Sequence, residues 1–187
     1  MNAYDFDKTI YIRDSSVDFT LYCLKKYPSA FLHILPSLAV KGVQYVFGRC
    51  DFRKLKEAAF AYLQYIPDAS AEAKKFWEEK RDGIGQWYLT RRRDDDVIIS
   101  ASPEFLLRPI AELLNVELIA TEMDSRSGKL SGDNCHDKEK VRRLFEKHPD
   151  AHIDEFYSDS LTDSPLAEIA DRAFRVNQGG IKPWERA

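Results

Sequence analysis

The feature that most constrains the fold is a pair of carboxylates, Asp5 and Asp7, directly after the apolar start of the chain. If residues 2–6 form a buried strand, its carboxyl end opens into the crevice in which open α/β sheets bind ligands, and both acids reach that crevice. Two ionised carboxylates in a dry pocket repel each other, so a proton or a cation must lie between them. Mg²⁺ fits best, because it takes one or two carboxylates and keeps its other positions for water and phosphate oxygens.

Three further segments carry polar residues at the end of a predicted element. Residues 97–102 form a short apolar run that ends in hydroxyls, which predicts a second strand that brings Ser100 to the same edge. The charged segment 135–141 predicts the start of a helix that offers an ammonium group near its N-terminal end. A strand predicted over 153–157 is followed by further acids. Together with the first pair of acids, these segments predict one site built from four pieces of the chain.

In this order the four segments resemble the haloacid dehalogenase-like (HAD) phosphatases, specifically subfamily IB, to which the phosphoserine phosphatases belong. The resemblance spans nearly the whole chain. It implies an α/β fold, a three-layer Rossmann-like parallel-sheet core formed by residues 1–13 and 94–187, with a helical (C1-type) cap over residues 14–93 inserted after the first strand. It also implies a Mg²⁺-dependent phosphatase that forms an aspartyl-phosphate intermediate.

The resemblance gives each motif residue an expected role. Asp5 is the expected nucleophile, and Asp7 is the expected general acid and base. Ser100 is expected to donate a hydrogen bond to a phosphoryl oxygen, and either Lys138 or Lys140 to supply positive charge, with the motif comparison favouring Lys140. The expected metal ligands are Asp5, Asp7, Asp159 and Asp163, the last either through water or as support for the others. The expected substrate-binding residues are Thr9, Asp14, Ser100 and Ala101.

Some polar residues near these motifs have a simpler interpretation. Ser102 stands directly before Pro103 and is typical of a helix N-cap or a loop hydroxyl. His136 lies beside the lysine motif, but lone histidines are usually surface residues. The basic run 91–93 is balanced by the acidic run 94–96, which predicts a solvated connection into the second strand.

Composition limits the other classes of function. A chain of 187 residues with 44% hydrophobic content can bury one substantial core and a small accessory layer. The net charge of −3, without a basic face, argues against nucleic acid as a partner. Three cysteines, an odd number, do not form a disulfide framework, and their spacing matches no metal site. The first predicted strand begins too close to Met1 to leave room for a signal peptide. We therefore expect a cytoplasmic protein, and the sequence predicts no particular oligomeric state.

About eighty residues separate the first two motifs, far more than a simple connection between strand and helix requires. Their pattern predicts helices from Ser15 or Ser16 to Lys26, over 30–47 with a break near Pro36, over 52–65, and over 71–90 with an interruption near Gly83 and Gly85. The following alternation predicts strands over 97–101, 116–121, 152–157 and 173–176, helices over 103–114, 138–147 and 163–170, and a hairpin turn at 125–128. This order is typical of a parallel sheet with right-handed crossovers.

Two substrate classes remain open. Asp14 falls where phosphoserine phosphatases carry a substrate-recognising acid, and an acid there could pair with an amino group. The cap arginine that would bind the substrate carboxylate has no clear equivalent, because Ala59 stands near its place, which leaves Arg49 or Arg53 as substitutes from another turn. A small phosphorylated substrate such as phosphoserine is therefore one alternative.

The other alternative is a lipid phosphate of the phosphatidylglycerol phosphate type. Twelve of the eighteen residues in 30–47 are apolar, and polar interruptions make the stretch unsuitable for spanning a bilayer but compatible with peripheral membrane contact. The simpler interpretation is a pair of helices that form the core of the cap itself. A relative that binds phospho-ligands without turnover is a third hypothesis, against which the presence of Asp5 argues.

Overall fold

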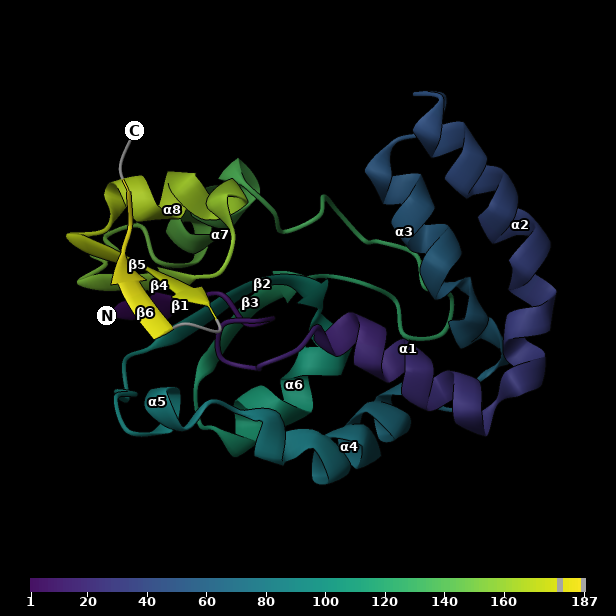
Figure 1. Cartoon of the computed structure of the whole chain (residues 1–187), viewed down its shortest axis with the longest axis horizontal. Coiled ribbons are helices and arrows are strands. Elements are labelled where there is room, and N and C mark those ends of the chain that lie inside the picture. The colour runs from purple at the N-terminus through teal and green to yellow at the C-terminus, as the bar shows by residue number, and fades with distance from the viewer. Residues whose placement is uncertain (178–179, 186–187) are drawn as a thin grey trace.

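The computed structural model describes residues 1–177 and 180–185, so the predicted core residues 178–179 and 186–187 lie outside it. A six-stranded sheet with the order β3-β2-β1-β4-β5-β6 forms its centre (Figure 1). The parallel strands are β1 (Asn2–Tyr4), β2 (Val97–Pro103), β3 (Glu117–Thr121), β4 (Glu155–Ser158) and β5 (Arg172–Asn177), and β6 (Gly180–Pro183) runs antiparallel to β5. The chain moves outward from β1 to β2 and β3 and then returns to β4 on the other side of β1. The carboxyl ends of β1 and β4 therefore form a topological switch point, where open α/β sheets bind their ligands.

Both faces of the sheet are covered, which explains why its central strands are apolar at successive positions. Ala3 and its register partners in β2 and β4 pack with α7 (Lys138–Lys147) and α8 (Ser164–Ile169). Tyr4 and its register partners point to the opposite face and pack in the cluster that includes α4 (Ala69–Lys80) and α6 (Glu104–Leu113). The short helix α5 (Gln86–Leu89) lies on the same side as α4 and α6 (Figure 1). The predicted three-layer α/β fold with a mostly parallel sheet is confirmed.

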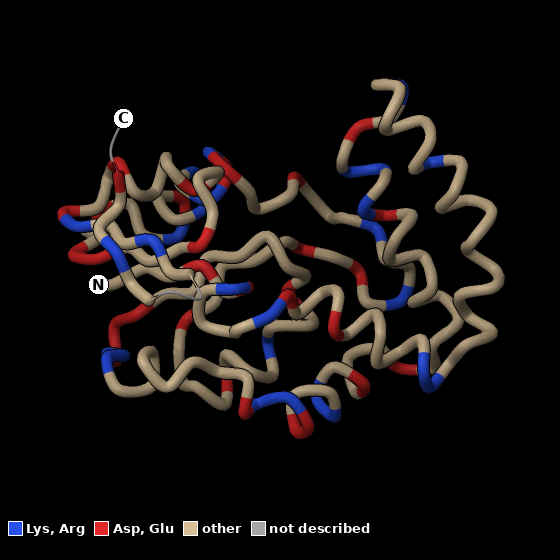
Figure 2. Tube along the Cα trace, in the orientation of Figure 1, with Lys and Arg blue, Asp and Glu red and all other residues tan. Residues whose placement is uncertain are grey.

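Three helices project beyond the sheet. They are α1 (Ser15–Lys26), α2 (Pro28–Val46) and α3 (Phe52–Phe60), followed by the 3₁₀ segment η1 (Ala61–Tyr65); we call residues 15–65 the helical projection (Figure 1). Asp14 caps α1 by accepting from Val17 N, and Asp51 caps α3 by accepting from Lys54 N. In Figure 2, α2 has little charge along its length, whereas charged residues are spread over the rest of the molecule.

The predicted break at Pro36 is wrong, because α2 continues through it. A proline inside a helix removes one hydrogen-bond donor and leaves the carbonyl four residues earlier without its partner. Here Pro36 and Leu32 both lie on the exposed side of α2, where water can satisfy that carbonyl. Pro28 occupies the first turn of α2, a position in which the missing N–H costs nothing.

The remaining differences concern the start of one strand, the hairpin at 125–128 and a short edge strand. The strand predicted over 152–157 begins only at Glu155. The predicted hairpin around 125–128 forms no extended strands: it has one isolated bridge, between Met123 and Leu130, and is closed by backbone hydrogen bonds such as Asp124 N to Lys129 O at 2.8 Å. The edge strand β6 was absent from the predicted pattern. It has four residues, is mostly exposed and pairs with β5 alone, so it lacks the alternation of apolar and polar residues that reveals a strand.

Candidate active site

A cavity of about 490 Å³ lies between the carboxyl ends of the strands and the helical projection. The loop after β1 contributes Asp5 and Asp7, β2 contributes Ser100, and α7 contributes Lys140. The segment after β4 contributes Asp159 and Asp163, while α1 and α3 line the opposite side. The structure thus brings residues from all four predicted segments to one cavity at the switch point of the sheet.

Asp5 and Asp163 share one buried cation. Lys140 Nζ donates to Asp5 Oδ1 at 2.7 Å and to Asp163 Oδ2 at 2.8 Å, and the lysine side chain is 2% exposed. Ser158 Oγ donates to the same oxygen of Asp163 at 2.7 Å. Burial raises the pKa of Asp5 to about 7, because the ammonium of Lys140 only partly offsets the loss of water and the nearby charge of Asp163. Burial disfavours the charge on Lys140, but its two carboxylate partners keep its pKa above the ordinary value.

Asp7 is held by donors from two other elements. Ser15 N, at the start of α1, donates to Asp7 Oδ1 at 2.6 Å, and Ser102 Oγ donates to Asp7 Oδ2 at 2.5 Å. Burial raises the pKa of Asp7 to about 6 despite these hydrogen bonds. The prediction that Ser102 is a helix cap or loop hydroxyl is wrong: Ser102 lies in β2, and Pro103 occupies the N-cap position of α6. Its hydroxyl instead fixes the orientation of Asp7.

Thr9 lies behind Asp5 and is buried. Its hydroxyl is 3.4 Å from Asp5 Oδ2, to which it donates, and it accepts from Asp159 N at 3.0 Å. Thr9 therefore joins the loop after β1 to the loop after β4. Burial also raises the pKa of Asp159, whose carboxylate lines the cavity. The predicted substrate-binding residue Thr9 is thus placed where it supports Asp5, and it does not line the cavity.

The other predicted substrate-binding residues do line the cavity. Ser100 is buried, and its Oγ accepts from Ser102 N at 3.1 Å, so β2 turns sharply around the hydroxyl. The carbonyl oxygen of the next residue, Ala101, accepts a hydrogen bond from Lys56 Nζ. Asp14 caps α1 and lines the cavity from the side of the helical projection.

The two candidate lysines have different environments. Lys138 is exposed and does not line the cavity, whereas Lys140 is buried within it. Two residues along an α-helix are about 200° apart in rotation, so only one of them can face the site. Asp137, just before α7, has φ 56° and ψ −131°, a combination that residues with side chains rarely adopt. This unusual backbone sets the rotation of α7 at which Lys140 reaches Asp5.

Lys56, on α3, is a site residue that the sequence did not reveal. Its Nζ donates to Ala101 O at 2.6 Å and to Asn134 Oδ1 at 2.7 Å. Burial lowers the pKa of Lys56 to about 8, and the nearby charge of Asp7 partly offsets this effect. Nothing in the local sequence distinguishes Lys56 from the exposed Lys54 two residues earlier. Only the position of α3 across the cavity from the end of β2 identifies it.

The arginines proposed as substitutes for the cap arginine lie elsewhere. Arg53 Nη2 donates to Leu130 O at 2.9 Å, so this residue ties α3 to the turn after β3. Arg49 is exposed in the connection between α2 and α3. The cations that line the cavity are Lys8, Lys56 and Lys140, and the described lining contains no arginine.

The donor set of this cavity fits a hard divalent cation. Four carboxylates (Asp5, Asp7, Asp159 and Asp163) line it, and burial raises the pKa of three of them, Asp5, Asp7 and Asp159. Lys140 compensates only part of this negative charge, through Asp5 and Asp163. Oxygen ligands and an excess of negative charge are what Mg²⁺ requires.

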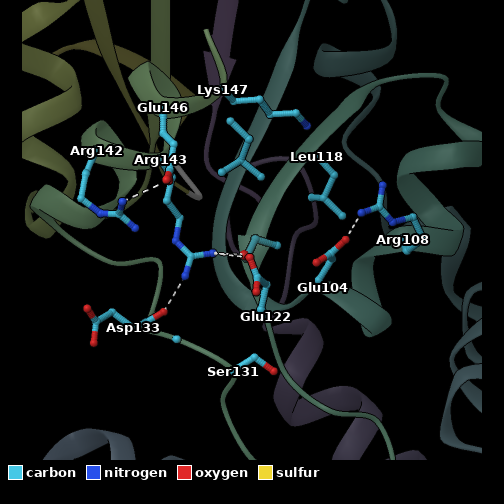
Figure 3. Close-up of a pocket in the computed structure, with 13 residues that line it drawn as sticks. Glu104, Arg108, Leu118, Glu122, Ser131, Asp133, Arg142, Arg143, Glu146 and Lys147 are labelled. Carbon is cyan, nitrogen blue, oxygen red and sulfur yellow. Dashed lines mark hydrogen bonds and ion pairs between the residues drawn. The ribbon is translucent and has the colours of Figure 1, made fainter. Parts of the chain in front are cut away.

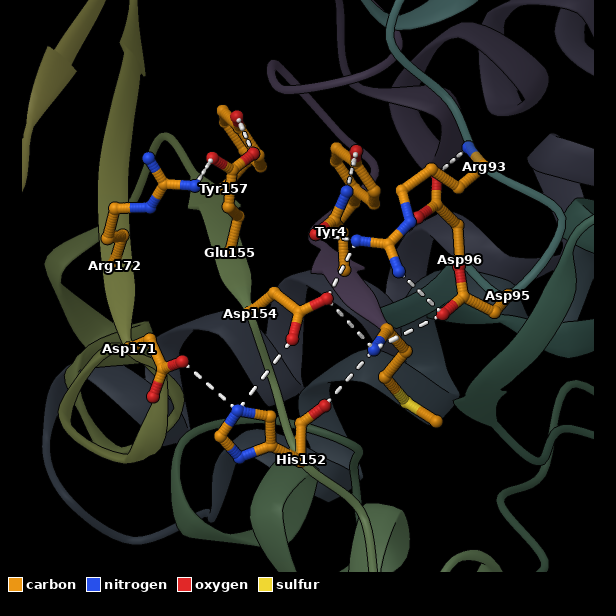
Figure 4. Close-up of polar contacts among 12 residues, drawn as sticks. Tyr4, Arg93, Asp95, Asp96, His152, Asp154, Glu155, Tyr157, Asp171 and Arg172 are labelled. Atoms are coloured by element: carbon orange, nitrogen blue, oxygen red, sulfur yellow. Dashed lines mark hydrogen bonds and ion pairs between the residues drawn. The ribbon is translucent and has the colours of Figure 1, made fainter.

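Two other polar regions lie away from these carboxylates. A larger cavity of about 670 Å³ follows the edge strand β3, where Arg143 donates to Ala120 O and Asp133 O, and its charged residues pair with one another (Figure 3). At the amino ends of the strands, His152, Asp154 and Asp171 lie close together (Figure 4). Asp154 is already bound by Arg93 at 2.7 Å and contacts the N-terminal ammonium. Neither region shares a lining residue with the cavity at Asp5.

Comparison with known proteins agrees with this arrangement. The profile of the haloacid dehalogenase-like hydrolases matches residues 3–168. Protein CicA of Caulobacter vibrioides is 33% identical over 196 residues, covering 95% of this chain and 86% of CicA. A Bordetella pertussis Tohama I protein of unknown function shares the fold with a TM-score of 0.71 and 21% identity, covering 92% of this chain and 87% of that chain. A phosphoserine phosphohydrolase-like protein from Francisella tularensis subsp. tularensis SCHU S4 gives 0.53 and 21%, with coverage of 92% and 86%.

A Rossmann-like sheet with a carboxylate site at its switch point is typical of hydrolases that act through carboxylates. The chain belongs to the haloacid dehalogenase-like hydrolase family. The predicted family and the prediction of an enzyme are therefore confirmed.

Proposed function

We propose that the protein is a Mg²⁺-dependent phosphatase that hydrolyses a phosphomonoester through an aspartyl-phosphate on Asp5. The observation that carries the proposal is the buried Asp5 carboxylate at a cavity wall, with Oδ1 fixed by Lys140 at 2.7 Å. A carboxylate held in this way is a competent nucleophile for phosphoryl transfer, which depends mainly on positioning and charge neutralisation.

The reaction has two steps. A carboxylate oxygen of Asp5 attacks phosphorus, the bond between phosphorus and the ester oxygen breaks, and Asp7 gives its proton to the leaving oxygen. Water then attacks the phosphorus of the aspartyl-phosphate while Asp7 takes its proton, and the bond to Asp5 breaks to release phosphate. Ser15 N and Ser102 Oγ keep Asp7 oriented in both steps. Ser100 and Lys140 bind phosphoryl oxygens, and Thr9 keeps Asp5 and the loop after β4 in register.

The carboxylates of Asp5 and Asp159 and the backbone carbonyl of Asp7 would hold Mg²⁺, with Asp163 in support, and the bound ion would neutralise charge on the phosphoryl group. Asp163 already accepts from Lys140 and Ser158, so it helps to orient the other acids. We also place the protein in the cytoplasm, because its three cysteines are all free and buried, as is typical of a reducing compartment.

Asp7→Asn is expected to lower kcat/KM for an alkyl phosphate by roughly 10²- to 10⁴-fold, because the leaving alkoxide then receives no proton. The loss should be much smaller for an aryl phosphate, whose leaving group needs no acid. Since burial raises the pKa of Asp7 to about 6, the parent should lose activity on the alkyl ester as the pH rises above that value. Steady-state kinetics from pH 5 to 8 would test this. Equal losses on both esters would contradict the acid role.

Lys56 lines the cavity, and we expect its ammonium to bind the substrate phosphate. Lys56→Met should therefore lower kcat/KM by roughly 10- to 100-fold, mainly through KM, because a charge-assisted hydrogen bond is worth about 1.5–3 kcal/mol. The parent should bind substrate less tightly above pH 8, since burial lowers the pKa of Lys56 to about 8 and its charge is lost there. Lys54→Met, two residues earlier on the exposed side of α3, is the control. A KM equal to that of the control, with lower stability, would make Lys56 a structural contact only.

The projection side of the cavity suggests the substrate class. Val17, Phe52, Leu55, Ala59 and Phe60 line it, and the charged groups on that side are Asp14 and Lys56. A small phosphomonoester remains the first candidate. The apolar lining favours a lipid phosphate as the second candidate, since acyl carbons gain free energy when they leave water for such a surface.

Phosphate release from phosphoserine, a sugar phosphate and phosphatidylglycerol phosphate, measured with Mg²⁺ and after chelation, tests the function. Release that stops on chelation, together with inhibition by vanadate, would support the proposed chemistry. The preferred ester would then choose between the two substrate classes. Absence of turnover by the folded, Mg²⁺-binding protein on every ester would instead favour a phospho-ligand-binding relative.

A further inference from the structure

The outer face of α2 is apolar along its whole length and is exposed. Leu32, Leu35, Val43 and Val46 are 68%, 53%, 58% and 80% exposed, and Phe47 follows at the end of the helix with 72%. Intervals of three, eight and three residues between Leu32, Leu35, Val43 and Val46 place these four on one side of the helix. Isolated exposed apolar residues are ordinary, but a continuous stripe on a projecting helix marks an interaction surface. We call these five residues the α2 stripe.

The packing of the helical projection does not use this stripe. Ala30 and Ile34 form the buried side of α2, and Phe31 stacks on Tyr62 with ring centroids 4.5 Å apart. This inner side accounts for the contacts of α2 with α3 and η1. The prediction that the helices form their own core therefore explains the apolar residues of α2 that pack inward and leaves the stripe without a function.

Helix α2 and the turns at its two ends carry basic but no acidic residues. Residues 19–50 contain Lys25, Lys26, Lys41 and Arg49 but no Asp or Glu, although the whole chain has 31 acidic residues and a net charge of −3. Figure 2 shows this directly, because the trace of α2 is tan and blue without red. Lys41 Nζ, on the helix itself, donates to the neutral side chain of Gln44. Lys41 lies on the side of α2 opposite Leu32, so the basic charge does not border the stripe closely. The helical projection as a whole is basic, with seven Lys and Arg against three Asp and Glu in residues 15–65. An apolar surface that is anionic overall therefore complements it.

We propose that the α2 stripe docks on the surface of an anionic lipid bilayer, with the helix lying in the plane of the interface. An amphipathic helix with apolar residues on one face and basic residues on the other binds in this way, and each basic group near the surface adds to the attraction. No helix among residues 1–177 and 180–185 is long and apolar enough to cross a membrane, so the contact is peripheral.

A second copy of the chain is the competing occupant. A twofold contact through the α2 stripe would place the same patch on both subunits and would bring two basic projections together. The helical projection has a net charge of +4, from seven Lys and Arg and three Asp and Glu in residues 15–65, so the two subunits would repel each other. An anionic bilayer satisfies both the apolar and the charged part of the surface, and a second α2 satisfies only the apolar part. The proposal concerns α2 alone and does not depend on catalysis at Asp5.

Sedimentation with vesicles tests the proposal. The full chain should sediment with vesicles of phosphatidylglycerol and phosphatidylcholine and much less with phosphatidylcholine alone. Val43→Gln combined with Val46→Gln should weaken this binding at least ~10-fold, because two valine side chains no longer leave water. Leu113→Gln, an equally polar change at a residue that is 61% exposed on α6, should leave binding unchanged. Lys25→Gln with Arg49→Gln, at two exposed basic residues near the ends of α2, should weaken binding to anionic vesicles only.

Circular dichroism and turnover of a soluble phosphate ester should be the same in the parent and the α2 variants, because Val43 and Val46 do not line the cavity. Failure of the parent to sediment with either vesicle would overturn the proposal. So would equal binding by the valine double variant. A dimer that the double variant abolishes, without vesicle binding, would identify a second copy as the occupant and would also overturn it.

Discussion

Asp5→Asn is expected to reduce phosphate release at least ~10⁴-fold, because a neutral amide cannot attack phosphorus as a carboxylate does, and loss of a nucleophile typically costs this much or more. The fold should be retained, since the amide oxygen can still accept from Lys140 Nζ, which is 2.7 Å from Asp5 Oδ1. Asp94→Asn removes an exposed acid at the opposite, amino end of β2 and is the control. Residual activity equal to that of the control would exclude Asp5 as the nucleophile.

The same variant, although inactive, should gain stability relative to the parent as the pH rises. Burial raises the pKa of Asp5 to about 7, above the value of about 4 in an unfolded chain, so the folded metal-free state binds the extra proton between these values. The contribution of Asp5 to stability is therefore present at low pH and is lost as the pH rises towards 7. Asparagine does not titrate. The melting temperature of metal-free Asp5→Asn, relative to that of the parent, is thus expected to rise between pH 5 and pH 8.

The sequence predicted the parts of the site that depend on local pattern. Asp5 and Asp159 each follow a buried strand, Ser100 lies at the midpoint of β2, and parallel strands bring their carboxyl ends to one edge. An apolar run followed by a polar residue is visible without any knowledge of packing. The same reasoning predicted the sheet, whose central strands are buried on both faces.

The parts of the site that the sequence did not predict depend on how elements distant in the chain are placed in the tertiary structure. Lys56 reaches Ala101 O because α3 lies across the cavity from the end of β2, and Ser102 reaches Asp7 because β2 and the loop after β1 are neighbours in space. Neither contact has a signal in the local sequence. The choice between Lys138 and Lys140 depends on the rotation of α7, which follows from the rare backbone conformation of Asp137. A motif comparison gave a preference there, but only the helix orientation gives a physical reason.

Lys140→Met is expected to lower the free energy of unfolding by about 3–5 kcal/mol at pH 8 and to abolish turnover, because it removes the one cation that Asp5 and Asp163 share in a buried place. Both carboxylates lose that partner, while Ser158 Oγ still donates to Asp163. Urea unfolding followed by circular dichroism would measure the loss. Lys138→Met is the matched control on the exposed side of the same helix, and it should keep the stability and activity of the parent.

The pH dependence of this loss separates an electrostatic effect of Lys140 from a packing effect. Without the ammonium, the pKa of Asp5 must rise further above its ordinary value, since burial alone already raises it and the Lys140 charge opposes that rise. The acid is then neutral in the folded protein below the raised pKa, so the penalty should be largest at pH 8 and should shrink as the pH falls to about 5. Methionine fills a similar volume, so a packing defect would cost the same at both pH values. A loss of stability that does not change with pH would therefore contradict the charge-sharing role of Lys140.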